Sequence, residues 1–144
     1  SLLRQVEERH IQAVKALVAV QKQSPVLAQV KSMLNELEDV LHGIYLVRER
    51  TERTLDFVMS FGERLSAYII SQALVTGDVV CEFLDARTII RTDNQFGHAR
   101  VDFMATNYLV ADHFKKHPAL QVVTGFIASS SQGETTTLGR SGSD

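Results

Sequence analysis

The stretch that decides the fold lies near the end of the chain. It begins as Val123-Thr124-Gly125-Phe126-Ile127-Ala128 and continues, after a short polar segment, as Thr135-Thr136-Thr137-Leu138-Gly139-Arg140-Ser141-Gly142-Ser143-Asp144. The apolar, β-branched residues of the first part predict a buried strand. The intervening Ser131-Gln132-Gly133-Glu134 predicts a hairpin turn, so the threonine triplet is expected to follow a reversal of the chain.

The final hexapeptide, residues 139–144, predicts a site for a small anion. Glycine lets the backbone approach a ligand closely, and the guanidinium of Arg140 fits a carboxylate or a phosphate with two parallel hydrogen bonds. Ser143 and Asp144 are favoured N-cap residues, so a helix whose free N–H groups face the anion is expected to begin there. Because that helix would lie beyond Asp144, and because residues 1–6 already have helical periodicity, we expect the sequence to be cut from a longer protein.

Composition limits the class of protein. A chain of 144 residues with 44% hydrophobic residues can bury one core. A formal net charge of −2 gives no basic surface for nucleic acid, and without an apolar run of about 18 residues no membrane span is expected. The single cysteine, Cys81, lies in an apolar run, which favours a buried small hydrophobe in a reducing cytoplasm.

The first third of the chain predicts two helices. Residues 1–20 have an amphipathic pattern, and Ser24-Pro25 predicts the start of a second helix with Ser24 as N-cap. Its apolar positions step by three and four residues: Leu27, Val30, Leu34, Leu37, Leu41 and Ile44. Such a seam is typical of a coiled-coil arm or of a helix packed in a hairpin. Three heptads are short for an independent coiled coil, so the hairpin is favoured.

The rest of the chain alternates helices with strands. The charged residues 48–53 predict a turn, and a helix follows in which Ser60 and Glu63 have the spacing of a capping box. Strands are predicted at 79–84 and 120–128, a short edge strand at 99–103, and a helix at 105–117 that Pro118 ends. This alternation predicts an α/β fold with a mostly parallel sheet.

Three segments together resemble the aspartate kinase family, in the family's order and at about its spacing. They are Ser60-Phe61-Gly62-Glu63-Arg64-Leu65-Ser66, Gly125-Phe126-Ile127 and residues 135–144, where Ser141 stands at a position that is commonly glycine. Leu41-His42-Gly43-Ile44 and the helices before it resemble the bifunctional aspartokinase–homoserine dehydrogenase type. The resemblance implies the amino-acid-kinase (carbamate-kinase-like) fold, a sheet between helical layers. Residues 1–144 would then be part of a catalytic domain, with a helical hairpin at 1–50 and an aspartate-binding α/β portion at 51–144.

The resemblance also implies a reaction and its residues. The family transfers the γ-phosphoryl group of ATP to the β-carboxylate of L-aspartate, the first step towards lysine, threonine, methionine and isoleucine. Glu63 would accept hydrogen bonds from the substrate ammonium, and Arg140 would hold the α-carboxylate. Phe126 would lie beside the bound aspartate, while Ser143 and Asp144 would complete the site. Catalytic roles are implied for Arg140 and Asp144.

Parts of the family pattern are missing from this sequence. The N-terminal Lys-Phe-Gly-Gly-Thr-Ser loop is absent, as are the nucleotide-binding half and the regulatory domains that follow Asp144 in the family. ATP and Mg²⁺ are the implied cofactors, with the nucleotide site mostly outside these residues and no metal ligand assigned within them. The 144 residues alone are therefore predicted to have no kinase activity, and the whole enzyme is expected to be a cytoplasmic homo-oligomer.

Two other functions stay open from the residues. Within the same fold, the protein could be a kinase for another acid, glutamate or N-acetylglutamate. From another class, it could be a non-catalytic helical oligomerisation module built on the seam from Leu27 to Ile44. Competition between aspartate and glutamate separates the first, and concentration-dependent dimerisation tests the second.

Overall fold

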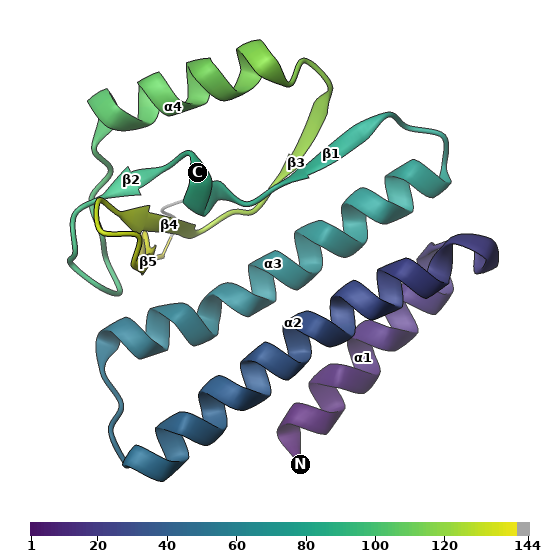
Figure 1. Ribbon diagram of the computed structural model, residues 1–144, viewed down its shortest axis with the longest axis horizontal. Helices are drawn as coiled ribbons and strands as arrows, with labels where there is room; N and C mark the ends of the chain where they lie inside the picture. Colours follow the sequence, from purple (N-terminus) through teal and green to yellow (C-terminus); the bar gives the residue numbers. More distant parts are fainter. Residues whose placement is uncertain (141–144) are drawn as a thin grey trace.

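The computed structural model describes residues 1–140 as an α/β arrangement of four α-helices and five short strands (Figure 1). In chain order the elements are α1 (Leu2–Leu17), α2 (Val20–Val47), α3 (Glu52–Thr76), β1 (Cys81–Leu84), a 3₁₀ turn η1 (Ala86–Thr88), β2 (Arg91–Thr92), α4 (Phe103–Lys116), β3 (Leu120–Val123), β4 (Ile127–Ser130) and β5 (Thr135–Thr137). The strands lie between α4 on one side and α3 on the other, with α2 and α1 beyond α3.

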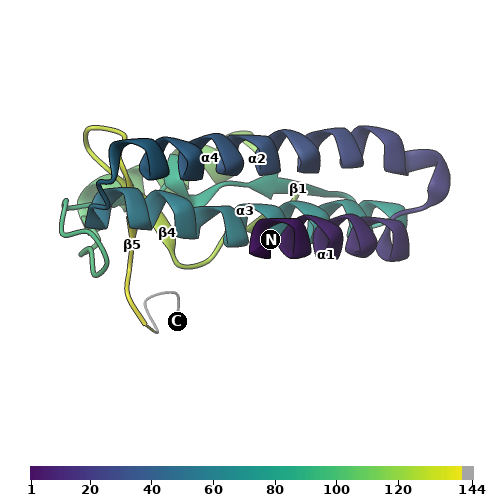
Figure 2. The same ribbon diagram turned by 90° about the horizontal axis from the view of Figure 1, so that it is seen from below.

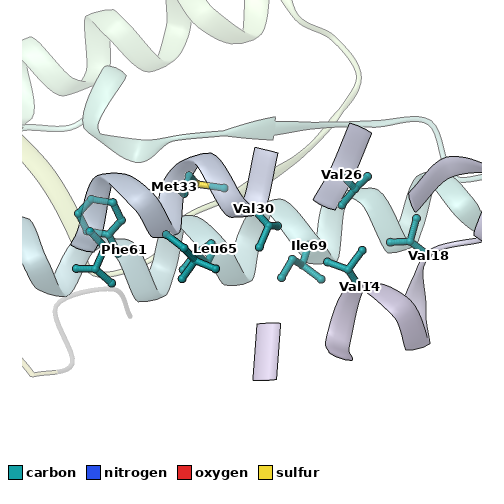
Figure 3. Close-up of a cluster of buried hydrophobic side chains, with 10 residues drawn as sticks. Val14, Val18, Val26, Val30, Met33, Phe61, Leu65 and Ile69 are labelled. Carbon is teal, nitrogen blue, oxygen red and sulfur yellow. The ribbon is translucent and has the colours of Figure 1, made fainter. Parts of the chain in front are cut away.

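The first three helices form one layer with a common apolar core. They run alongside one another down the long axis of the molecule (Figure 2). Their buried side chains meet in a single cluster (Figure 3), made of Val14, Val18, Val26, Val30, Met33, Leu34, Leu37, Phe61, Leu65 and Ile69. The seam predicted in the second helix therefore faces α1 and α3 of the same chain at Val30, Leu34 and Leu37, as a packed hairpin requires.

The start of α2 differs from the prediction. The helix begins at Val20, and Pro25 lies inside its second turn instead of at its first position. The side-chain amide of Gln23 explains the earlier start, because it donates to the carbonyl oxygens of Lys15 (3.2 Å) and Val18 (2.8 Å). These contacts satisfy carbonyl groups that the end of α1 leaves without helical partners, and they hold the residues before Pro25 in the helix.

The predicted capping box at Ser60 and Glu63 is wrong. Both residues lie in the middle of α3, whose N-cap is Thr51. The Thr51 hydroxyl accepts from the backbone N–H of Thr54 (3.1 Å), and the Thr54 hydroxyl accepts from the backbone N–H of Thr51 (3.0 Å). Ser60 is buried and donates to the carbonyl oxygen of Phe57 (2.7 Å), one turn back in the helix. The S-x-x-E pattern therefore belongs to a helix interior, and Glu63 is available for another contact.

The strands form two small sheets in place of one. β1 pairs with β3 in parallel, from Cys81 opposite Leu120 to Leu84 opposite Val123. In the second sheet β4 lies between β2, which is parallel to it, and β5, which is antiparallel. Two of the three pairings of residues 1–140 are thus parallel, and the predicted hairpin at 131–134 joins β4 to β5.

Two predicted strands need correction. The segment 120–128 is not one strand, because the chain turns at residues 124–126 and passes from the first sheet into the second. The segment 99–103 forms only an isolated bridge from Val101 to Thr92, and α4 already begins at Phe103 with Asp102 as its N-cap. In residues 1–140, no helix combines the length and hydrophobicity that crossing a membrane requires.

Candidate active site

The turn between β3 and β4 is the centre of the candidate site. Thr124 anchors it: its backbone N–H donates to the carbonyl of Leu84 (3.1 Å), and its hydroxyl accepts from the N–H of Ala86 (2.9 Å). Phe126 then has a positive φ of 64°, and the N–H of Ile127 donates to the carbonyl of Gly125 (2.6 Å). A hydrogen bond between residues two apart is the pattern of a γ-turn, which is strained when the central φ is positive. Such strain is concentrated at functional sites in proteins.

Glu63 reaches this turn from α3. One oxygen of its carboxylate, Oε2, accepts from the backbone N–H of Gly125 (3.2 Å). The side chain is half-buried, and a carboxylate has acceptor capacity for further donors. Glu63 and Phe126, which are 63 positions apart, are therefore brought together at one turn.

The segment that carries Arg140 begins at the same place. The backbone N–H of Leu138, just after β5, donates to the carbonyl of Phe126 (3.0 Å). Arg140 follows two residues later, which limits its Cα to about 7 Å from that of Leu138. Its side chain is exposed. The predicted site residues Ser143 and Asp144 lie outside the described residues.

Gly139 sets the path of the chain into Arg140. Its φ is +77°, a conformation that L side chains rarely adopt, and a Cβ built there would lie 3.4 Å from the carbonyl oxygen of Gly97. The loop around Gly97 is attached to β5 as well, because the N–H of Ala99 donates to the carbonyl of Thr137 (2.9 Å). Gly139 thus permits the close approach of these two segments.

Asp56 is a residue of this region that the sequence analysis missed. It is 1% exposed, and its carboxylate accepts three hydrogen bonds. Oδ2 accepts from the N–H groups of Gly97 (2.8 Å) and Thr137 (3.0 Å), and Oδ1 accepts from the hydroxyl of Thr137 (2.9 Å). The sequence feature that could have identified Asp56 is its spacing from Glu63. It lies seven residues earlier and therefore on the same face of α3.

Arg64, which is next to Glu63 in the resembling segment, is used for packing. Its guanidinium donates to Glu36 of α2 (3.1 Å) and lies 4.4 Å above the ring of Phe61. Neighbouring residues on a helix point about 100° apart, which explains how Glu63 reaches the strands while Arg64 reaches α2.

A cavity of about 730 Å³ lies elsewhere, between the first turn of α3 and the β4–β5 hairpin. Phe57, Phe96 and Arg87 line it, and an ion pair joins Arg53 to Glu134 (3.2 Å) at its wall. Of the predicted site residues that the structure describes, Glu63, Phe126 and Arg140, none lines this cavity. Among residues 1–140, no cluster of three His, Cys, Asp or Glu side chains is placed to hold a metal ion.

The chain has clear relatives among curated proteins, although no protein-family model matches it. It is 33% identical over 144 residues to the chloroplastic bifunctional aspartokinase/homoserine dehydrogenase 2 of Zea mays, covering 99% of this chain and 16% of the relative. It is 36% identical to the chloroplastic aspartokinase 1 of Arabidopsis thaliana, covering 96% of this chain and 24% of the relative. It is 34% identical to the lysine-sensitive aspartokinase 3 of Escherichia coli, covering 76% and 26%.

Solved structures agree with these relatives. The crystal structure of E. coli aspartokinase III in complex with aspartate and ADP superposes with a TM-score of 0.89 at 26% identity, covering 98% of this chain and 31% of that one. The complex of the same enzyme with lysine and aspartate gives a TM-score of 0.90 with the same coverage. This chain therefore spans about a sixth to a third of the proteins that it matches.

Proposed function

Since this chain is homologous to one segment of the aspartokinases, we propose that it forms the aspartate-binding part of an aspartate kinase. The whole enzyme would transfer the γ-phosphoryl group of ATP to the β-carboxylate of L-aspartate and yield 4-phospho-L-aspartate. The relatives include bifunctional proteins, as the resemblance implied, and also aspartokinases without a dehydrogenase in their names.

One observation carries the proposal: Glu63 and Phe126 meet at a single turn, and the segment that leads to Arg140 begins there. The Glu63 carboxylate contacts Gly125, and the Phe126 carbonyl holds Leu138, two residues before Arg140. An amino-acid zwitterion requires an anionic contact for its ammonium group and a cationic contact for its carboxylate. Glu63, which contacts Gly125, and Arg140, which follows Leu138 by two residues, would supply these two charges.

The chemical role of these residues is to bind and orient aspartate. Phosphoryl transfer needs an oxygen held in line with the phosphoryl group and positive charge on the phosphates, and it needs no nucleophilic side chain. Glu63 would accept from the ammonium, Arg140 would grip the α-carboxylate, and Phe126 would cover the carbon chain, so that the β-carboxylate stays free to react. Ser143 and Asp144 would complete the site at the start of a helix.

ATP and Mg²⁺ are assigned to the whole enzyme and not to residues 1–140. The E. coli relative was crystallised with ADP, which supports nucleotide use by the family. The described residues gather no ligand cluster that fits a metal ion. Mg²⁺ would supply positive charge on the phosphates when bound, but no residue described here is proposed to hold it.

The proposal extends to the fold and the assembly. The two small sheets between α3 and α4 would be parts of the central sheet of an amino-acid-kinase fold. The whole protein is proposed to be a homo-oligomer, to act in the synthesis of lysine, threonine and methionine, and to work in a reducing compartment such as the cytoplasm. The oligomerisation-module alternative is not favoured, because α1 and α3 cover Val30, Leu34 and Leu37 of its seam.

The test is calorimetric titration of the full-length protein that contains this segment, with Mg²⁺ and a non-hydrolysable ATP analogue present. L-Aspartate is expected to bind and L-glutamate is not. Arg140→Ala is expected to weaken aspartate binding by about 2–4 kcal/mol, because the α-carboxylate loses its two-pronged partner. The exposed Arg50 offers a matched control, and Arg50→Ala is expected to bind like the unchanged protein.

Equal binding of aspartate by the parent protein and by Arg140→Ala would show that Arg140 is structural and that the site is misplaced. Binding of glutamate in preference to aspartate would favour the alternative kinase. The isolated 144 residues are expected to show no aspartate-dependent ATP turnover, and clear turnover would contradict the assignment of the nucleotide site to the rest of the enzyme.

A further inference from the structure

Asp56 is a buried carboxylate that accepts hydrogen bonds from two segments close to Arg140. It is 1% exposed and accepts from the N–H of Gly97, the N–H of Thr137 and the hydroxyl of Thr137 at 2.8–3.0 Å. The two carboxylate oxygens have the acceptor capacity for these three donors. A side chain so placed fixes the two backbone segments it contacts relative to α3.

Those two segments enclose the residue before Arg140. Thr137 ends β5, two residues before Gly139, and Gly97 comes from the loop against which Gly139 packs. The N–H of Ala99 also donates to the carbonyl of Thr137, so the loop and the strand are joined to each other. Asp56 therefore holds both of the segments that contact the chain just before Arg140.

Asp56 and Glu63 act from the same helix. Seven residues are nearly two turns, so both side chains leave α3 on one face, about 10 Å apart along the axis. Glu63 contacts Gly125 at the entry to β4, and Asp56 contacts Thr137 at the exit from β5. The two carboxylates bind the two ends of one hairpin to one rigid helix.

We propose that Asp56 is a positioning residue of the aspartate site, which sets the place of Arg140 relative to Glu63 by fixing Thr137 and Gly97 to α3. This inference rests on the proposed function. Without the hydrogen bonds of Asp56, the guanidinium of Arg140 would no longer be held at the separation from Glu63 that the ammonium and α-carboxylate of aspartate require. The expected loss is in aspartate recognition, while the nucleotide, which is bound elsewhere, is unaffected.

Steady-state kinetics of the full-length protein test this, with Asp56→Asn as the variant. The asparagine keeps the shape of the side chain but removes its charge and one acceptor oxygen. We expect the KM for aspartate to rise on the order of 10-fold to 100-fold, as a small misplacement of a binding group produces, while the KM for ATP stays within about twofold. Ile69→Val or Ile69→Ala, chosen to match the loss in Tm, is the control, because Ile69 is a core residue of the same helix outside the site.

A double-mutant comparison separates positioning from general stability. In an Arg140→Ala background, Asp56→Asn is expected to cause no further rise in the KM for aspartate, because the group that it positions is already gone. A full, additive rise in that background would overturn the inference, and so would an Asp56→Asn variant that behaves like the Ile69 control. If Arg140→Ala by itself leaves aspartate recognition unchanged, the proposed site fails instead.

Discussion

Phe126 combines an unfavourable backbone conformation with a role in the proposed site. Its φ of 64° is unfavourable for any residue with a Cβ atom. The residue is nevertheless held in place, because its own carbonyl accepts from the N–H of Leu138 and the N–H of Ile127 donates to the carbonyl of Gly125. A glycine would adopt this conformation without strain, but it would place no ring beside a substrate. The presence of phenylalanine is consistent with a role for the ring that outweighs the cost of the backbone.

The positive φ of Phe126 leads to a stability prediction. Alanine is usually more stabilising than glycine, but at position 126 the glycine variant is expected to be the more stable of the two. Phe126→Gly and Phe126→Ala both remove the ring, but only alanine keeps the strain of the left-handed conformation. The glycine variant is expected to be more stable by about 1 kcal/mol. Urea denaturation measures the difference. Val122, in β3, is the control position, where alanine is expected to be the more stable of the two variants; a more stable alanine at position 126 as well would show that the turn relaxes.

At the scale of elements, the end of α4 is attached to the first sheet by a polar network. His117 Nδ1 and the amide of Gln121 both contact Oε2 of Glu82 (3.1 and 3.0 Å), and His113 Nε2 contacts Oε1 of Gln121 (3.1 Å). The two imidazole rings are stacked, with centroids 4.4 Å apart. The hydrogen bond from Gln121, followed by the nearby histidines, lowers the pKa of Glu82 below its ordinary value.

The lowered pKa of Glu82 predicts how the stability contributed by this network changes at acid pH. The contribution of Glu82 is present above the pKa of the unfolded chain, about 4.3, and is lost as the pH falls through the lower folded value. Between about pH 5 and pH 3 the parent protein is therefore expected to lose more stability than Glu82→Gln. Denaturant titrations at several pH values measure this, and parallel losses in the two proteins would mean that the network contributes nothing.

At the scale of the whole molecule, the three-helix layer is the base on which the strands are arranged. α3 belongs to the core of that layer through Phe61, Leu65 and Ile69, and it also packs on β1, β3 and β5. The face that carries Asp56 and Glu63 is thus the back of a helix whose other side is fixed by apolar packing. Stability of the layer and geometry of the site are linked through this one element.

The layer can be tested with two valines of α2. Val30 is fully buried in the cluster, whereas Val47 is 67% exposed near the end of the same helix. Val30→Ala is expected to lower the free energy of unfolding by about 2 kcal/mol, from lost burial and the cavity that remains. Val47→Ala is expected to change it by less than about 0.5 kcal/mol. Chemical denaturation gives both values, and equal losses would contradict the assigned core.

The sequence predicted the periodic parts of this fold well and the boundaries less well. The seam of α2 was readable because its apolar spacing is that of a helix buried on one side. The start of α2 was not, because the contacts of Gln23 with Lys15 and Val18 depend on how two helices meet. The capping box at Ser60 failed for a similar reason, since a local pattern cannot show that the helix had already begun at Glu52.

The sequence by itself determined the alternation of helices and strands, the hairpin at residues 131–134, and the resemblance that singled out Glu63, Phe126 and Arg140. The first two follow from residue type and short spacing, whereas the third is a resemblance to a known family. Only the tertiary structure decided that residues 120–128 divide between two sheets, and that the carboxylate of Asp56 accepts hydrogen bonds from Gly97 and Thr137. The physical reason is that a buried carboxylate is satisfied by donors 41 and 81 positions away, and such partners are chosen by packing and not by neighbours in the chain.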